Sequence, residues 1–476
     1  MRVHPAIRTS LILASILACP AGPAAGSEPE DAGARLDRWL SAAEFRGAVL
    51  VARDGTVLLR KGYGLADREQ AIPYGPDTVS TIGSITKQFT AAAILKLEMQ
   101  GKLRVADLID KYLPGVPEDK RAITLHHLLT HTSGLESDFA GDYDPVSRDE
   151  YVRRALSSVL RSAPGQSYHY ANSGYSLLGA IVETVSGKGY ETYLRDELFT
   201  PAGMRETGYK LPQWDTGRIA VGYRDGERWG RSTEKPWAAD GPYWALRGNG
   251  GVLSTPDDLL RWHAALAGEQ VLSASAKQKM FTPHVRQGAA DTFYGYGWMI
   301  GKDPWGGRLV AHNGGNQVFF ADFLRLLDER LVVILMTNDS TVRGGRVAES
   351  LARLAHGEEV PVPRRGDPAA SRPLGDGARE SLVRAWIDAF NAEDLGPMHA
   401  FRAAHAVPHP GVDDAERDRR LQTLRDDLGR LELEGLVDDA GEALTVRARS
   451  VRGPVTLRFM FAGDGKLDGI GVEVGD

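Results

Sequence analysis

The alternation of apolar and polar positions divides the chain into two units with different layouts. In the first unit, residues 45–64 and 293–339 carry short apolar runs separated by turn residues, which is typical of β-strands. Asp54–Gly55 indicates a tight hairpin, and residues 328–330 indicate a turn between the last two strands. Residues 84–285 mix helical periodicity with loops. Because the strands lie at both ends of this unit, we expect them to join one antiparallel sheet covered by helices.

A second, smaller unit follows a break in composition. Residues 357–375 are polar and rich in proline, so we interpret them as a linker. Residues 376–476 begin with helical periodicity and end with four strand-like runs separated by turn residues. This order predicts a small α+β domain, which is also a candidate surface for dimerisation. Apolar residues share one face of its first helix: Leu382, Trp386, Ile387 and Phe390.

Length, composition and charge favour a globular protein that does not bind nucleic acid. The chain has 476 residues, of which 42% are hydrophobic and 25% charged, enough for a large domain and a smaller one. The net charge is -6, and no run of Lys and Arg supplies the basic surface that phosphate binding requires. After the N-terminal region, no apolar run approaches the length of a transmembrane helix.

Residues 1–26 indicate a signal peptide, because Arg2 and Arg8 precede the apolar run 10–22 and small residues follow it. We therefore expect an exported protein, either periplasmic or secreted. Cys19, the only cysteine of the chain, leaves two interpretations open. It is either a lipid attachment site, which would anchor the protein to a membrane, or an incidental residue of a removed leader.

Ser84 and Lys87 are spaced so that both lie on one face of a predicted helix, one turn apart. A serine hydroxyl is a poor nucleophile unless a base lies close to it. Lysine, whose ordinary pKa is about 10.4, becomes a base when burial and the positive end of a helix disfavour its charged form. The pair is therefore a candidate nucleophile and base. The alternative is a serine that caps the helix and an unrelated lysine.

A second candidate group, Tyr170 and Asn172, precedes a long apolar helix. A tyrosine in a polar turn can act as a general acid or base if a nearby cation lowers its pKa. An amide two residues later can hold a substrate carbonyl or tether Lys87. The alternative is that Asn172 caps the helix and Tyr170 packs beneath it.

A third candidate group lies in a strand-like run that contains His312, Gly314 and Gly315. The glycines would let a substrate lie close to the strand edge. The backbone N–H groups of Gly315 and Ser84 could together bind an oxyanion. Taken alone, the run is equally compatible with ordinary strand glycines and a surface histidine.

In this order, S-x-x-K at 84–87, Y-x-N at 170–172 and H-x-G at 312–314 resemble the motifs of the serine β-lactamase and penicillin-binding-protein superfamily. The resemblance is greatest to class C β-lactamases, D-stereospecific peptidases and related esterases, and it covers residues 34–356. It implies a β-lactamase-like α+β fold, in which an antiparallel sheet is flanked by helices and joined to an all-helical region. Residues 376–476 resemble, more loosely, the cone-like NTF2/SnoaL domains. Three further stretches are similar to the first family: 61–67, 123–135 and 248–262.

Carried onto the matching residues, the resemblance implies an acyl-enzyme mechanism without a metal or cofactor. Ser84 would attack a carbonyl, and Lys87 and Tyr170 would accept and relay its proton. Asn172 would orient Lys87 and the substrate. The N–H groups of Ser84 and Gly315 would form the oxyanion hole.

His312 departs from the family pattern, because β-lactamases and carboxypeptidases usually have lysine at that position. That lysine binds a carboxylate, whereas histidine is largely neutral at pH 7. With His312 and Gly314 beside the substrate, we expect the hydrolysis of a small ester, an amide or a D-amino-acid peptide. Two alternatives stay open: a penicillin-binding D-Ala-D-Ala carboxypeptidase or β-lactamase, and an inactive module that binds envelope peptides.

Three histidines, His126, His127 and His131, also invite a metal-binding interpretation. The metalloprotease pattern requires a Glu between two of them, and none is present. We therefore expect no metal site, and the family resemblance implies that these residues form the end of a helix.

Overall fold

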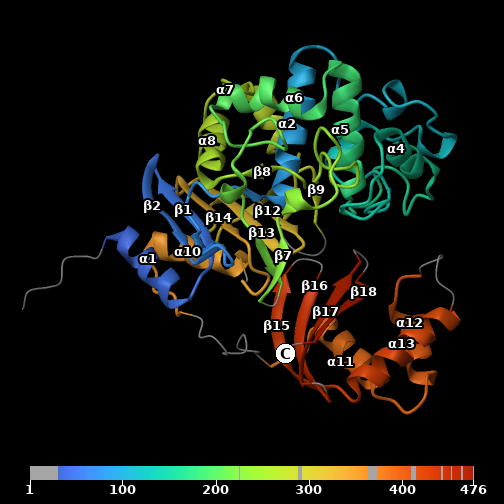
Figure 1. The fold of residues 1–476 in the computed structure, drawn as a ribbon. Helices are drawn as coiled ribbons and strands as arrows, with labels where there is room; N and C mark the ends of the chain where they lie inside the picture. Colours follow the sequence, from blue (N-terminus) through green and yellow to red (C-terminus); the bar gives the residue numbers. More distant parts are fainter. Residues whose placement is uncertain are drawn as a thin grey trace, which may run out of the picture.

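The computed structural model shows a large unit built on a central sheet and a smaller C-terminal unit (Figure 1). The predicted signal peptide, including Cys19, and much of the predicted linker lie outside the described residues. In the described part of the chain, no helix combines the length and the apolar character needed to cross a bilayer. The structure describes residues 31–224, 226–287, 292–342, 344–362, 373–408, 414–440, 443–451, 453–462 and 465–474.

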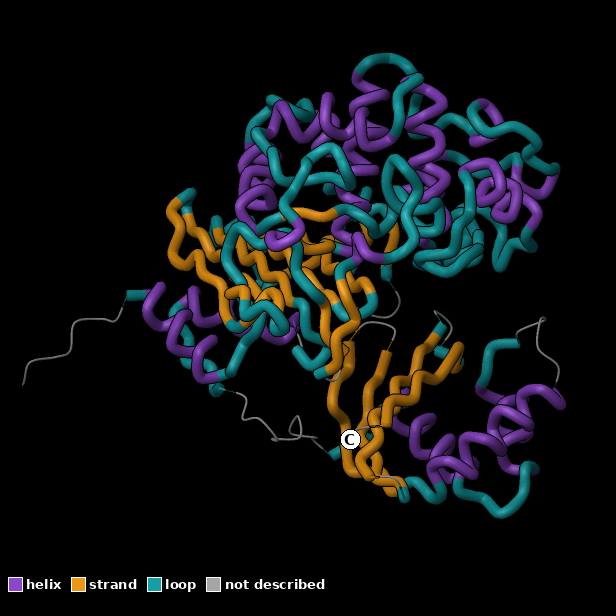
Figure 2. The backbone as a smooth tube through the Cα atoms, viewed as in Figure 1, coloured by secondary structure: helices purple, strands orange, loops and turns teal. Residues whose placement is uncertain are grey.

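An antiparallel sheet of eight strands forms the centre of the large unit (Figure 2). In spatial order, its strands are β2 (Thr56–Tyr63), β1 (Gly47–Arg53), β14 (Leu331–Thr337), β13 (Phe319–Leu326), β12 (Arg308–Asn316), β11 (Met299–Lys302), β10 (Phe293–Tyr294) and β9 (Val285–Arg286). Because β1 pairs with β14, the strands from both ends of the unit share one sheet, which confirms the prediction. Asp54 and Gly55 turn between β1 and β2 with φ angles of 52° and 77°, as a tight hairpin requires.

Helices cover both faces of this sheet (Figure 1). α1 (Ala32–Ala42) and α10 (Gly344–His356) lie on one face, and α2 (Thr86–Met99) and α8 (Pro256–Ala267) lie on the other. The apolar residues of β14 alternate between the two cores, odd-numbered ones packing with α1 and α10 and even-numbered ones with α2 and α8. A strand buried on both faces explains the continuous apolar run in the sequence.

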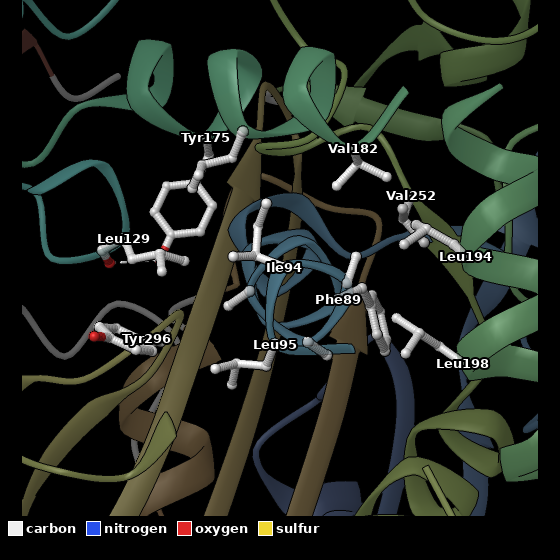
Figure 3. Close-up of a cluster of buried hydrophobic side chains, with 14 of the residues drawn as sticks. Phe89, Ile94, Leu95, Leu129, Tyr175, Val182, Leu194, Leu198, Val252 and Tyr296 are labelled. Carbon is white, nitrogen blue, oxygen red and sulfur yellow. Dashed lines mark hydrogen bonds between the residues drawn. The ribbon is translucent and has the colours of Figure 1, made fainter. Parts of the chain in front are cut away.

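The α2 helix lies at the centre of the helical region and is buried on all sides over most of its length, as expected for a helix surrounded by other elements. Figure 3 shows Phe89, Ile94 and Leu95 of α2 among apolar side chains from neighbouring elements. The other helices are α3 (Leu125–Leu129), α4 (Arg148–Ser157), α5 (Asn172–Ser186), α6 (Tyr190–Leu194), α7 (Thr200–Ala202) and α9 (Ala274–Met280). Short strand pairs complete the unit: β3 (Leu65–Asp67) with β4 (Ile72–Pro73), β5 (Ser80–Thr81) with β8 (Leu253–Ser254), and β6 (Gly222–Arg224) with β7 (Glu227–Gly230).

The C-terminal unit places three helices before a four-stranded antiparallel sheet, in the order that the sequence predicts (Figure 1). In its core, the ring of Trp386 lies 5.1 Å from that of Phe390 and 5.4 Å from that of Phe459. An ion pair of 3.5 Å between Arg161 and Asp468 joins this unit to the large one. Its elements are α11 (Ala378–Phe390), α12 (Gly396–His405), α13 (Asp414–Leu428), β15 (Glu432–Ala440), β16 (Ala443–Ser450), β17 (Gly453–Phe461) and β18 (Leu467–Val474).

Candidate active site

Ser84 and Lys87 lie at the N-terminal end of the central helix. Ser84 belongs to a 3₁₀ turn, Gly83–Ile85, which continues directly into α2, where Lys87 occupies the first turn. The two side chains meet, because Nζ of Lys87 donates to Oγ of Ser84 over 2.9 Å. The capping alternative is wrong, since no side chain caps the start of α2.

Lys87 is completely buried, and three oxygen atoms surround its amino group. Besides Ser84 Oγ, Nζ contacts Oδ1 of Asn172 at 2.7 Å and the backbone carbonyl of Asn249 at 2.9 Å. Burial lowers the pKa of Lys87 to about 7, and nearby carboxylates oppose this shift only in part. At neutral pH, about half of the molecules therefore carry a neutral amine, which can accept a proton from Ser84.

Tyr170 lies against the same pair but remains a protonated phenol at neutral pH. Nζ of Lys87 lies 4.8 Å from the centre of the Tyr170 ring, and the phenol shares a hydrogen bond with the Ser84 side chain. The condition set for a general base, a pKa lowered by a nearby cation, is not met at Tyr170, because burial raises the pKa well above the ordinary value. Tyr170 is therefore suited to donate a proton near Ser84, while Lys87 is the better acceptor.

His131, which the sequence did not single out for this site, holds the segment that carries Tyr170. Its Nδ1 accepts a hydrogen bond from the N–H of Ala171 over 3.0 Å, and its carbonyl accepts one from the N–H of His169 over 2.8 Å. The imidazole lies 4.3 Å from the ring of Tyr170. His131 adopts a φ of 58°, a strained conformation for a residue with a Cβ. Its only trace in the sequence is its place within the family-like stretch 123–135.

Asn172 connects Lys87 to a carboxylate at the surface. Its Oδ1 accepts from Lys87, and its Nδ2 donates to Oδ2 of Asp138 over 3.2 Å. Asn172 is the first residue of α5 and does not cap it, so the capping alternative is wrong here also. Asp138 was missed at the sequence level, because nothing in its surroundings along the chain marks it.

Glycine allows strand β12 to lie directly against the turn that carries Ser84. A Cβ on Gly314 would lie 2.6 Å from the backbone nitrogen of Ser84, and a Cβ on Gly83 would lie 2.8 Å from that of Gly315. Real Cβ atoms do not approach so closely, so both positions require glycine. The space beside Gly315 is open. The amides of Ser84 and Gly315 thus lie close together at the border of open space, where an oxyanion could be bound.

His312 is not a surface histidine, which was the alternative interpretation of this run, since only 3% of the residue is exposed. Its Nε2 lies 2.9 Å from the hydroxyl of Tyr294, and its Nδ1 donates to the carbonyl of Asn313 over 2.6 Å. Burial, together with the charge of Lys87, lowers the pKa of His312 to about 3. The side chain is therefore neutral and offers no charge to a substrate carboxylate.

His126 and His127, which precede His131 in the chain, make contacts that stabilise the local structure. Nδ1 of His126 lies 2.8 Å from the hydroxyl of Tyr296, and His127 forms a reciprocal cap with Thr124 at the start of α3. Across the described ranges, no group of three or more His, Cys, Asp or Glu side chains is arranged to hold a metal ion.

Comparison with known proteins agrees with this geometry. The Beta-lactamase family model matches residues 37–357. Penicillin-binding protein 4* of Bacillus subtilis is 30% identical over 341 residues, which cover 68% of this chain and 75% of that protein. A penicillin-binding protein structure from Bacillus halodurans is 27% identical, with a TM-score of 0.58 over 67% of this chain and 99% of that one.

One fold neighbour extends through the C-terminal unit. The octameric penicillin-binding protein homologue from Pyrococcus abyssi matches with a TM-score of 0.61 over 94% of this chain and 96% of that one, at 22% identity. Since the family model covers most of the chain and a relative shares 30% identity, the family predicted from the motifs is confirmed. The chain belongs to the β-lactamase family and is a serine hydrolase related to penicillin-binding proteins.

Proposed function

We propose that the protein is an exported serine hydrolase that forms an acyl-enzyme on Ser84 and hydrolyses a small ester, an amide or a D-amino-acid peptide. The observation that carries this proposal is the 2.9 Å contact between Ser84 Oγ and a fully buried Lys87 whose pKa is about 7. An exposed lysine would be almost entirely protonated at neutral pH and could not take the serine proton.

Acylation begins when the neutral amine of Lys87 takes the hydroxyl proton and Oγ of Ser84 attacks the carbonyl carbon. The N–H groups of Ser84 and Gly315 stabilise the oxyanion that forms. When this intermediate collapses, the bond to the leaving group breaks and the phenol of Tyr170 protonates that group. The ammonium of Lys87 then returns a proton to Tyr170, which leaves Lys87 neutral for the next step.

Deacylation uses the same groups with water as the nucleophile. Neutral Lys87 takes a proton from the water that attacks the acyl carbonyl, and the phenol of Tyr170 orients that water. Collapse of the second intermediate releases a carboxylic acid and returns the proton to Oγ of Ser84. Asn172 keeps Lys87 in place throughout, because its Oδ1 lies 2.7 Å from Nζ.

A neutral His312 favours substrates without a carboxylate beside the scissile bond. The penicillin-binding relative supports the alternative that β-lactams or D-Ala-D-Ala peptides are substrates. The two possibilities separate in one comparison of kcat/KM for a p-nitrophenyl ester, a D-alanine p-nitroanilide and nitrocefin. We expect the ester or the D-amino-acid amide to exceed nitrocefin. A nitrocefin value equal to that of a dedicated β-lactamase would overturn this preference.

The proposed nucleophile can be tested without knowing the substrate. The purified protein is treated with a fluorophosphonate probe, and the adduct is mapped by mass spectrometry in the wild type, Ser84→Ala and Ser275→Ala, an exposed serine of α9. We expect an adduct on Ser84 in the wild type and in Ser275→Ala, and none in Ser84→Ala. A folded wild-type protein without an adduct would contradict the proposal and favour the inactive binding module.

Export rests on the signal-like residues 1–26 and on the penicillin-binding relative. Expression of the full chain followed by cell fractionation should find the protein outside the cytoplasm. If Cys19 carries a lipid, Cys19→Ser should move the protein from the membrane fraction to the soluble fraction. Full-length protein that stays in the cytoplasm would refute export.

A further inference from the structure

The C-terminal unit contains a pocket that the proposed hydrolysis does not use. Its volume is about 770 Å³, within the range of roughly 300–1,000 Å³ common for small-molecule sites. The pocket is formed by α11, α12, α13 and the start of β18, which Figure 1 shows within the C-terminal unit. Much of its lining is apolar and comes from these four elements: Trp386, Met398, Phe401, Leu421, Leu424 and Ile470. These side chains suit the apolar body of a ligand.

Charged side chains meet at the same pocket, and the basic ones outnumber the acidic ones. Asp414 pairs with Arg417, and Asp418 outside the lining pairs with Arg402, so the positive charge is partly balanced, but the lining still favours an anion over a cation. The lining includes Arg402, Arg417, Arg420 and Lys466 on the basic side, and Asp414 and Asp468 on the acidic side.

Arg402 retains hydrogen-bonding capacity that its neighbours leave unused. Its Nη2 donates to Asp418, a carboxylate that also contacts His399. Its Nε and Nη1 are buried, and neither has a hydrogen-bond partner within the described ranges. Buried donors without partners are rare, because each loses its water without compensation. A carboxylate entering the pocket would supply acceptors after a small turn of the guanidinium, in a charge-assisted hydrogen bond.

We propose that this pocket binds an amphipathic carboxylate, a molecule with an apolar body and one carboxylate that pairs with Arg402. A neutral apolar molecule would fill the same space but leave the Arg402 donors unpaired. A cationic amphiphile would meet the basic lining. The site is separate from Ser84, so this proposal can be tested independently of the proposed hydrolysis.

The test uses the full chain with decanoate as the probe and decanol and decyltrimethylammonium as its neutral and cationic counterparts. Isothermal titration calorimetry compares the wild type with Arg402→Gln and with Arg449→Gln, an exposed arginine of β16 that pairs with Glu434. We expect the wild type and Arg449→Gln to bind decanoate at least about tenfold more tightly than decanol. Arg402→Gln should lose this preference while keeping its affinity for decanol.

A second variant guards against a folding defect in Arg402→Gln. Ala403 is exposed on α12 and lines the pocket, so Ala403→Trp places a large ring in the space without removing a core contact. This variant should weaken decanoate and decanol together. Equal affinity of the wild type for the two probes, or undiminished decanoate binding by folded Arg402→Gln or Ala403→Trp, would overturn the proposal.

Discussion

Replacing Asp138 by Asn should make Ser84 more reactive at acidic pH. Asp138 raises the pKa of Lys87, while burial lowers it to about 7. Removing the carboxylate charge therefore removes a stabilising partner of the ammonium form, and the pKa of Lys87 should fall. In the proposed mechanism the neutral amine accepts the serine proton, so a lower pKa means more of the reactive form below pH 7.

The size of the shift follows from the geometry between the two charges. Nζ of Lys87 and Oδ2 of Asp138 are linked through the side-chain amide of Asn172, by hydrogen bonds of 2.7 and 3.2 Å. With the width of the amide included, the two charges lie roughly 8 Å apart. At that distance, effective dielectric constants between about 80 and 20 give about 0.5–2 kcal/mol. Asp138 is exposed, which favours the lower part of this range. We expect the pKa of Lys87 to fall by about 0.5–1 unit, which raises the neutral fraction at pH 6 about 2.5- to 5.5-fold.

The assay is the rate of labelling by the fluorophosphonate probe between pH 5.5 and 8.5. In the wild type, the rate should rise with pH through about pH 7, the pKa of Lys87. Asp138→Asn should move this rise to lower pH and leave the rate at pH 8.5 unchanged. Asp149→Asn, whose side chain is 88% exposed in α4, serves as the matched control. High salt should reduce the difference between the pH midpoints of labelling of Asp138→Asn and of the wild type, because salt screens the charge of Asp138. An unchanged midpoint, or one displaced to higher pH, would refute the assignment of Lys87 as the base.

Three further predictions test the support of the site and of the fold. Gly314→Ala should reduce the labelling rate of Ser84 by roughly a hundredfold, because its Cβ would lie 2.6 Å from the backbone nitrogen of Ser84. Gly189→Ala, whose Cβ would meet no atom within 4 Å and which lies outside the site, should label like the wild type; similar rates for the two variants would contradict this. His131→Leu should slow the labelling of Ser84 by roughly tenfold, because the variant loses the acceptor for the N–H of Ala171. His131→Asn keeps an acceptor and tolerates the positive φ, so its labelling rate should fall less; equal losses of rate in the two variants would show that the acceptor is unimportant. Asp322 is buried in β13, and burial raises its pKa to about 8, so the folded state holds a proton that the unfolded state releases above pH 4. The free energy of unfolding of the wild type should therefore fall between about pH 4 and 8. Measured by urea unfolding, the free energy of unfolding of Asp322→Asn relative to the wild type should rise by up to ~1.4 kcal/mol per pH unit over this range; a difference independent of pH would be inconsistent with this.

Much of the fold could be predicted because its signals are local. The hairpin at Asp54–Gly55 and the doubly buried run of β14 follow from short-range patterns of turn and apolar residues. The joining of β1 to β14 was predictable from the need of strands at both ends of the unit to find partners.

The candidate site was only partly predictable, because several of its groups act through positions that no residue type announces. The contribution of Asn249 is a backbone carbonyl, which every residue possesses, so its role leaves no mark in the sequence. Asp138 and His131 reach the site from segments distant along the chain. The pKa of Tyr170 is raised by burial, and burial depends on side chains that are brought together only in the folded protein.

By itself, the sequence determined which residue types are present and how far apart they lie: a serine and a lysine one helical turn apart, and glycines where β12 meets the Ser84 turn. The tertiary structure alone decided their chemistry. The pKa of Lys87 falls to about 7 because helices and strands remove it from water, and His312 loses its charge for the same reason. Desolvation is a property of the packed surroundings, which are assembled from segments far apart in the chain, and so it cannot be read from the neighbours of a residue in sequence.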